Sequence, residues 1–388
     1  MLLELSLTVA RTGFAQRCGL CLRQDVASLQ YTAHPVPNRP GAVAMARWKP
    51  LFVVTLVLLL AIAALAWYRH TQPTILAIDG RTMGSGWSVR FVAPGSADVA
   101  AVRAHLEEEL AAIDLAVSGY RDDSALARLN TAPVGEWVDI PGHLANTLRF
   151  GLELWRDSDG AFDMTVKPLV ALWGFGAATP RDSVPTDAEI AAARARLGSG
   201  QLEMSPDGQR ARRLADIAID VDGVAPGYAA GVLSEWMTAN GYADHLVEIG
   251  GEMRASGHRP DGGGWRVGIE APEMLRGRIE HVIAVSDTAV TTAGDYRDYY
   301  EIDGVRYQHI LDPLTGWPVK HNLASVTVLA PGKLTADGYA TAIMVLGPER
   351  GLQFADALGL PVLMILRAED GSFSQRYNSR FAPYLAAD

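Results

Sequence analysis

The sequence predicts an α+β fold, in which mixed but largely antiparallel sheets pack against helices. Short alternating segments meet at turn-forming pairs such as Asp303-Gly304, which is typical of β-hairpins. Two long helical patterns cover residues 98–117 and 223–240. Strands and helices do not alternate regularly, as they would in a doubly wound parallel sheet. These three observations together favour the α+β class.

Composition and charge narrow the possible functions. The 388-residue chain is 49% hydrophobic and 20% charged, which is typical of a globular protein. The formal net charge is −10 and the chain has no long basic run. Because nucleic-acid binding would need a basic face, we do not expect that function. Length alone allows one large core or two ordinary domains. Because residues 75–388 show no internal repeat or low-complexity linker, we expect one domain over residues 73–388.

An uncharged apolar segment spans residues 51–67. As a helix it would be roughly 25 Å long at about 1.5 Å per residue, near the lower limit for crossing a bilayer core. Arg47 and Lys49 precede it, so the positive-inside rule places the N-terminus in the cytoplasm and the rest of the chain outside. The segment is a retained anchor or a cleaved signal, because Ala-Leu-Ala at residues 64–66 resembles a cleavage site.

The start of the chain is a separate question. Met45 lies just before the apolar segment and opens a basic region, so we expect residues 45–72 to be the signal or anchor segment. Residues 1–44 are an uncertain N-terminal extension, and Met45 is an alternative start. The only two cysteines, Cys18 and Cys21, lie in this extension, where no second pair or nearby histidine completes a metal or redox site. The rest of the chain needs no disulfide.

The elements follow from local patterns along the chain. A Gly-rich turn at Met83 enters a strand that ends at Phe91. Apolar residues at steps of three and four predict a helix over residues 98–117. Further helices are expected over residues 143–156, which run into a turn, and over 186–197, behind a capping threonine. Apolar residues that alternate with acids predict a strand over residues 214–221.

The second half of the chain shows the same mixture. We expect a helix over residues 223–240 and then a strand over 244–249 that closes at a Gly-Gly pair. Further apolar runs predict strands over 265–270, 281–290 and 324–330, a helix over 334–346, and a last helix and hairpin around Asp370-Gly371.

The stretch that ends at residue 318 is the most informative one for function. A hairpin with its turn at Asp303-Gly304 leads to His309 and Asp312, after which Pro313 and Gly316 force the chain out of regular structure. Polar groups at a strand end, held by a rigid turn, are typical of a reactive site. The alternative is a tyrosine-rich hairpin that ends in an ordinary Pro/Gly turn.

Two pairs of residues with oxygen-bearing side chains are candidate ligand sites. Asp337 and Thr341 are four apart on a predicted helix, so they share one face, and their oxygens suit a hard cation such as Mg²⁺. Asp220 and Asp222 end a predicted strand before Gly223, which allows close backbone approach to a ligand. In both groups the alternative is structural, because an acid near a helix start is favourable on dipole grounds.

Together these motifs resemble the ApbE-type FAD:protein FMN transferases over about residues 75–370. The His309-Ile-Leu-Asp-Pro-x-Thr-Gly316 and Gly160-Ala-Phe-Asp-Met-Thr165 motifs are the most specific. The others occur in the family's order: Met83-Gly84, Ser118-x-Tyr120-x-x-x-Ser124 with Asn130, Pro168-Leu169 with Trp173-Gly-Phe-Gly176, Asp220 through Gly227-Tyr228, Glu248-Ile-Gly-Gly251, Gly294-Asp295-Tyr296 and Ala336-Asp337-x-x-x-Thr341.

The resemblance implies a single ApbE-like catalytic domain and a Mg²⁺-dependent cleavage of FAD. FMN would be joined through its phosphate to a threonine hydroxyl of an acceptor protein, and AMP would leave. The resemblance implies Mg²⁺ ligands at Gly223, through a nearby backbone carbonyl, and at Asp337 and Thr341. It implies flavin contacts at Met83, Tyr120, Ala161, Phe162, Asp163, Asp220 and His309.

His309 is the candidate catalytic residue. Its pKa range suits a general base for the attacking hydroxyl, and Asp312 could hold its ring. Whether His309 acts as the base or only binds flavin stays open.

The sequence departs from the family pattern at Pro226, where many relatives carry a charged residue, and at Gly231, where many carry an aspartate. Pro226 can occupy a first helical turn, so flavin affinity is in question more than the fold.

Three functions remain open: the transferase, an FAD pyrophosphatase that uses water and releases FMN and AMP, and a non-enzymatic periplasmic flavin-binding protein. Family analogy suggests acceptors among subunits of membrane redox complexes of the Rnf, Nqr or nitrous-oxide-reductase-associated kind. The expected location is the periplasmic side of the bacterial inner membrane, where the N-terminal segment anchors the protein or is cleaved to release it.

Overall fold

A computed structural model describes residues 42–176, 181–272, 278–295, 299–330 and 335–385. The chain divides into two compact units, Met1–Ala63 and Ala64–Asp388. The predicted extension over residues 1–44 lies almost entirely outside the described residues.

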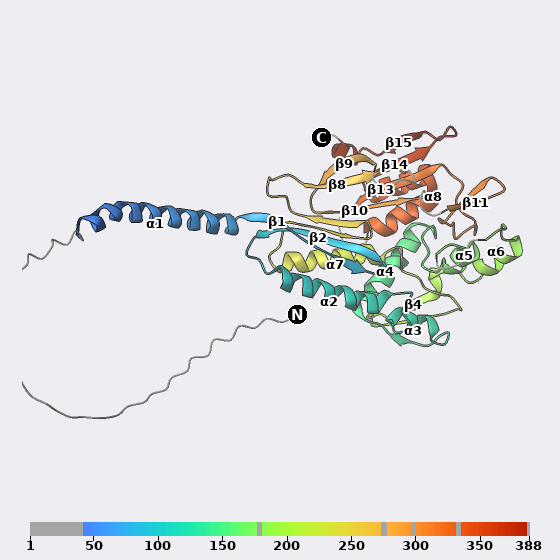
Figure 1. Ribbon diagram of the computed structural model, residues 1–388. Helices are drawn as coiled ribbons and strands as arrows, with labels where there is room; N and C mark the ends of the chain where they lie inside the picture. Colours follow the sequence, from blue (N-terminus) through green and yellow to red (C-terminus); the bar gives the residue numbers. More distant parts are fainter. Residues whose placement is uncertain (1–41, 177–180, 273–277, 296–298, 331–334, 386–388) are drawn as a thin grey trace, which may run out of the picture. The chain divides into compact units, whose positions relative to one another are not determined.

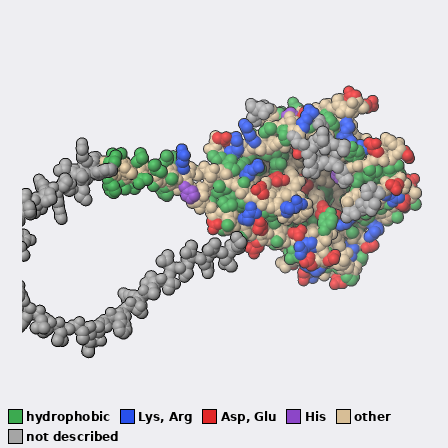
Figure 2. All heavy atoms as spheres, viewed as in Figure 1, with side chains coloured by type: hydrophobic (Ala, Val, Ile, Leu, Met, Phe, Trp, Pro, Cys, Tyr) green, Lys and Arg blue, Asp and Glu red, His purple; other side chains and the backbone are tan. Residues whose placement is uncertain are grey.

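Helix α1 (Ala42–Thr71) provides the described part of the first unit and extends beyond its boundary. Its segment Leu51–Thr71 is long and apolar enough to cross a membrane, with a mean hydropathy of 2.6 and no part of it buried. Hydrophobic side chains cover most of the coloured part of this helix in Figure 2, up to the basic residues near its end. These properties fit both an anchor and a signal sequence, because length and composition do not distinguish the two.

An eight-stranded antiparallel sheet forms the centre of the second unit (Figure 1). Its strand order combines hairpins with long crossings, which confirms the predicted α+β class. In spatial order the strands are β1 (Pro73–Thr82), β2 (Ser85–Pro94), β6 (His245–Ile249), β7 (Glu252–Ser256), β10 (Thr288–Gly294), β13 (Leu323–Ala330), β14 (Val362–Arg367) and β15 (Phe373–Tyr377).

Helices cover one face of this sheet. Helix α7 (Ala225–Ala239) contacts β6 and β7, and α8 (Thr335–Leu358) contacts β10 and β13. The two helices also contact each other, so they lie on the same face. Helices α2 (Val99–Val117) and α4 (Gly142–Asp157) add a further layer against them.

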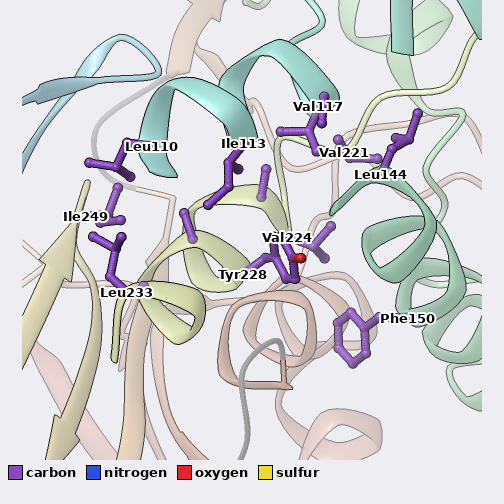
Figure 3. Packing of buried hydrophobic residues seen from close by; sticks show 14 of the residues in the cluster. Leu110, Ile113, Val117, Leu144, Phe150, Val221, Val224, Tyr228, Leu233 and Ile249 are labelled. Carbon is purple, nitrogen blue, oxygen red and sulfur yellow. The ribbon is translucent and has the colours of Figure 1, made fainter. Parts of the chain in front are cut away.

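The largest hydrophobic core lies between these helices and the sheet. Figure 3 shows Leu110 and Ile113 of α2, Tyr228 of α7 and Ile249 of β6, all of which belong to one buried cluster. Each fully buried aliphatic side chain contributes about 1.5–3 kcal/mol relative to an exposed one. On the opposite face Leu246 belongs to a different cluster with the β8–β9 pair, as the two-residue period of a strand requires. The sheet is therefore buried on both sides.

Smaller elements complete the unit. A three-stranded sheet contains β3 (Val138–Asp139), β5 (Arg210–Arg213) and β4 (Leu202–Met204), and two hairpins contain β8 (Trp265–Glu270) with β9 (Ile279–Val285) and β11 (Tyr299–Ile302) with β12 (Val305–Gln308). The short helices are α3 (Ala125–Thr131), α5 (Lys167–Leu172), α6 (Asp187–Arg194), the 3₁₀ turn η1 (Ser199–Gln201) and α9 (Ala382–Leu385).

Most of the predicted elements are present. The helix predicted over 98–117 begins behind Asp98, whose side chain accepts a hydrogen bond from the N–H of Ala101. Thr186 forms the expected cap of α6 as part of a capping box with Glu189. The run predicted as one strand over 281–290 instead belongs to two strands, β9 and β10, which a break between them separates. The helix predicted to end at residue 346 continues after a break at Gly347, where φ is 78°.

The strand predicted over residues 214–221 is wrong. The strand at this point, β5, ends at Arg213, and the following residues are irregular although Ile217 and Ile219 are buried. The side chain of Asn130 takes the place of a neighbouring strand. Its Oδ1 accepts a hydrogen bond of 2.8 Å from the N–H of Ile219, and its Nδ2 donates one of 2.8 Å to the carbonyl of Ile219. The alternating pattern therefore reflects burial without a strand partner.

Candidate active site

A cavity of about 740 Å³ opens between the helical layer, the sheet and the segment that follows β12. Its wall includes α5, strand β10, helix α8 and the irregular segments near residues 161–164, 220–223 and 309–313. This volume lies in the range of about 300–1,000 Å³ that is usual for sites that bind small molecules.

The cavity brings together every predicted site residue except Met83. Met83 lines a separate, smaller pocket of about 300 Å³, together with Arg81, Trp87 and Arg121. Its φ of 45° places it in the left-handed region at the β1–β2 turn. The predicted residues that do line the large cavity are Tyr120, Ala161, Phe162, Asp163, Asp220, Gly223, His309, Asp337 and Thr341.

The segment with Ala161 and Phe162 is held by Asp163. The carboxylate of Asp163 is buried and accepts hydrogen bonds from the N–H and hydroxyl of Thr165, at 2.8 and 2.6 Å, and from the hydroxyl of Ser199, at 2.8 Å. The carboxylate thus shapes the loop, and the backbone and side chains of its neighbours face the cavity.

Tyr120 and two acids form a second part of the wall. The hydroxyl of Tyr120 donates a hydrogen bond of 2.9 Å to Asp222, and the charge of Asp222, followed by this bond, raises the pKa of Tyr120 to about 12. Burial, and then the charge of Asp220, raise the pKa of Asp222. Tyr120 is 72% exposed, so its ring remains open to a ligand at the cavity mouth.

The candidate metal ligands meet at the start of α8. Asp337 is 7% exposed and accepts a hydrogen bond of 3.3 Å from the N–H of Gly227, in the first turn of α7. A Cβ atom on Gly227 would lie 2.9 Å from the Cβ of Asp337, so glycine is needed for this close approach. A Cβ atom built on Gly223 would lie 3.8 Å from the hydroxyl oxygen of Thr341, so Gly223 and Thr341 are neighbours.

Glu252, at the start of β7, is a cavity residue that the sequence interpretation missed. It accepts a hydrogen bond from the hydroxyl of Thr291 on β10. Burial, followed by the charge of Glu248, raises the pKa of Glu252 to about 7. Burial, and then the charge of Glu252, raise the pKa of Asp337 well above its ordinary value. The sequence signal that could have identified Glu252 is its position directly after the Glu248-Ile-Gly-Gly251 motif.

The side-chain oxygens of Asp337, Thr341 and Glu252 suit a hard cation. Asp337 is buried and Glu252 is half-buried, and two such carboxylates with few hydrogen-bond donors are costly when both are charged, unless a cation lies beside them. Carboxylate, hydroxyl and carbonyl oxygens are the ligands that Mg²⁺ prefers. Within the described ranges, no group of three or more His, Cys, Asp or Glu side chains is placed to hold a metal. A cation here would therefore also use the hydroxyl of Thr341, the carbonyl of Gly223 and oxygens of a substrate.

His309 follows β12 and lies at the cavity, with its ring 6.4 Å from that of Phe175. The turn after it depends on Asp312. The Asp312 carboxylate accepts hydrogen bonds from the N–H of Leu314 at 2.9 Å and from the hydroxyl of Thr315 at 3.0 Å. The hydrogen bonds shown for Asp312 thus close the turn, and its role in holding the His309 ring stays a prediction.

Pro226 occupies the first turn of α7 without breaking the helix, as predicted. Gly231, the other departure from the family pattern, is buried further along α7 and lines a different pocket, of about 290 Å³. Pro226 itself is absent from the wall of the large cavity. The departures at these two positions therefore leave the described cavity walls in place.

Comparisons with known proteins agree with this geometry. The ApbE family matches residues 83–364. The FAD:protein FMN transferase of Vibrio cholerae is 37% identical over 310 residues, which cover 80% of this chain and 92% of that protein. The enzyme of that name from Salmonella typhimurium is 35% identical over 321 residues, covering 82% and 91%. The apo structure of Pseudomonas stutzeri flavinyl transferase ApbE has a TM-score of 0.74 at 37% identity, and covers 82% of this chain and 98% of that one.

The curated relatives and the solved structure that this chain matches over most of its length are flavin transferases, so the chain is an enzyme of that class. The chain belongs to the ApbE family, whose match extends over most of the second unit.

Proposed function

We propose that this enzyme transfers FMN from FAD to a threonine hydroxyl of an acceptor protein in a Mg²⁺-dependent reaction that releases AMP. The observation that carries the proposal is that one cavity joins His309 to the oxygen ligands at the start of α8. A phosphoryl transfer needs both a base for the attacking hydroxyl and a site for a cation at the diphosphate.

In the proposed reaction the threonine oxygen attacks the phosphorus of the FMN half of FAD. A new oxygen–phosphorus bond forms, the bond to the AMP phosphate breaks, and AMP leaves with the electron pair. His309 accepts the proton of the threonine hydroxyl. The chemistry is mainly positioning and charge stabilisation, as in other phosphoryl transfers.

Asp337, Thr341 and the carbonyl of Gly223 would hold Mg²⁺, with Glu252 beside them. When bound, Mg²⁺ supplies stabilisation of the negative charge that develops at the diphosphate. Asp337 must be ionised to serve as a ligand, although burial favours its neutral form.

The remaining walls would orient the flavin. The loop that Asp163 holds presents Ala161 and Phe162 to the cavity, while Tyr120 offers an exposed aromatic face. Val170 and Met344 add apolar side chains to the cavity wall.

The test is an incubation of the full-length enzyme in detergent with FAD, Mg²⁺ and a threonine-bearing acceptor domain. The products are separated by denaturing gel and by chromatography of the small molecules. Flavin fluorescence on the acceptor band supports the proposal. Free FMN with AMP would instead indicate a pyrophosphatase, and intact FAD a flavin-binding protein.

We further propose that residues 73–388 form the catalytic domain on the periplasmic side of the inner membrane. This location would give the domain access to acceptor subunits of membrane redox complexes. The apolar composition of Leu51–Thr71 supports residues 45–72 as a signal or anchor. Protease treatment of intact spheroplasts tests this location, because an external domain is degraded while a cytoplasmic control protein survives.

A further inference from the structure

The large cavity has an unbalanced charge. Five acidic side chains line it: Asp163, Asp220, Asp222, Glu252 and Asp337. Among the residues that the structure describes, its wall contains a single lysine or arginine, Lys167. A dinucleotide substrate brings a negatively charged diphosphate into these surroundings, so its binding needs positive charge from the protein as well as from a cation.

Lys167 begins α5 and reaches between two parts of the cavity wall. Its Nζ lies 3.7 Å from a carboxylate oxygen of Asp220 and 5.6 Å from the centroid of the Tyr120 ring. A Cβ atom on Gly119 would lie 3.5 Å from the same Nζ. The ammonium group is thus between the Tyr120 loop and the segment that carries Asp220.

The contacts of Lys167 are weak ones. An N–O distance of 3.7 Å is longer than a hydrogen bond, and the side chains of Lys167 and Asp220 are 42% and 20% exposed. A solvent-exposed ion pair of this kind contributes little to stability. An ammonium group has three donors, and a phosphate oxygen can replace Asp220 at little cost.

The position of Lys167 relative to the metal ligands suits a diphosphate. Asp222 and Gly223 are consecutive residues, so their Cα atoms are about 3.8 Å apart. Asp222 belongs to the acid group beside Lys167, and Gly223 is next to Thr341. Lys167 therefore lies beside the segment 220–223, whose last residue is next to Thr341, and all of these residues line one cavity.

We propose that Lys167 binds the diphosphate of the dinucleotide substrate, by exchanging its contact with Asp220 for the phosphoryl oxygens. This inference rests on the proposed function. Lys167 is then a substrate-binding residue that recognises the phosphates rather than the flavin ring. Tyr120 and Asp220 are the present neighbours of the ammonium group. Once Lys167 binds the diphosphate, these two residues are free to contact the rest of the dinucleotide.

The test compares FAD with riboflavin, which has the same ring but no phosphate. Binding of each to the full-length protein in detergent is measured by flavin fluorescence, with Mg²⁺ and without acceptor, and chromatography checks that FAD stays intact. We expect Lys167→Gln to weaken FAD binding about tenfold, because a charged hydrogen bond is lost. Riboflavin binding should change less than about twofold, and Lys167→Arg should retain most of the FAD affinity.

Lys320→Gln is the matched control, because Lys320 lies over the Trp317 ring outside the cavity wall and its loss should leave both affinities unchanged. Unchanged FAD binding in Lys167→Gln would overturn the inference. An equal loss of FAD and riboflavin binding would also overturn it, since Lys167 would then act by holding Tyr120 or Asp220. If the wild-type protein binds no FAD at all, the proposed function itself fails, which is a separate result.

Discussion

Burial, and then the charge of Glu252 on β7, raise the pKa of Asp337 on α8, so two carboxylates from distant parts of the chain meet in one cavity. Neither residue alone indicates a metal site, because single buried acids are often structural. Two neighbouring carboxylates whose pKa values are both raised gain a clear physical use when a cation binds beside them, because the cation stabilises their ionised forms.

Asp337→Asn should abolish transfer while the protein remains folded. The substitution keeps the shape of the side chain but removes the charge that would hold Mg²⁺ at the diphosphate, so we expect a loss of at least about a hundredfold. Thermal unfolding should occur at the same or a higher temperature, because a buried like charge is removed. Asp216→Asn, at a surface carboxylate that is 78% exposed, is the control. Near wild-type transfer at limiting Mg²⁺ would contradict the metal assignment.

Stability of the metal-free enzyme should fall as pH rises from about 4.5 to about 7. Glu252 has an ordinary pKa of 4.5, which the fold raises to about 7. Between these values the folded state keeps a proton that the unfolded state has lost, so rising pH favours unfolding. Thermal unfolding in EDTA from pH 4.5 to 8 measures this effect. The difference from Glu252→Gln isolates it, and parallel curves for the two proteins would contradict the assignment.

His309→Ala should reduce the rate of transfer at saturating FAD by about 10²- to 10⁴-fold, which is typical for loss of a general base. Single-turnover experiments give this rate, and fluorescence titration gives FAD affinity. A preserved rate with weaker FAD binding would make His309 a flavin contact instead. A variant normal in both respects would remove His309 from the site.

Asn130→Ala should destabilise the segment that leads to Asp220. It leaves the N–H and carbonyl of Ile219 without the Asn130 amide, at a cost of about 1–3 kcal/mol for an unsatisfied buried group. We expect a lower unfolding temperature together with weaker FAD binding. Asn240→Ala, at the exposed end of α7, removes a local amide contact and is the control. Equal effects of the two variants would show that Asn130 has no special role.

The sequence predicted those features that depend on neighbouring residues. The hairpin before His309 follows from its Asp303-Gly304 turn, and α2 follows from its apolar spacing. Features that depend on distant partners were missed. Glu252 enters the cavity because β7 pairs with β10, which places Thr291 beside it. Residues 214–221 have the burial pattern of a strand, but no strand among the described residues pairs with them. The side-chain amide of Asn130 instead forms hydrogen bonds with the backbone N–H and carbonyl of Ile219.

The most direct test of the proposed reaction is to follow AMP release and acceptor-bound flavin together, by chromatography and by intact mass of the acceptor domain. We expect one AMP for each acceptor that gains FMN, with no gain in EDTA or when the accepting threonine is replaced by alanine. AMP that accumulates with free FMN, while the acceptor mass stays unchanged, would contradict the transferase.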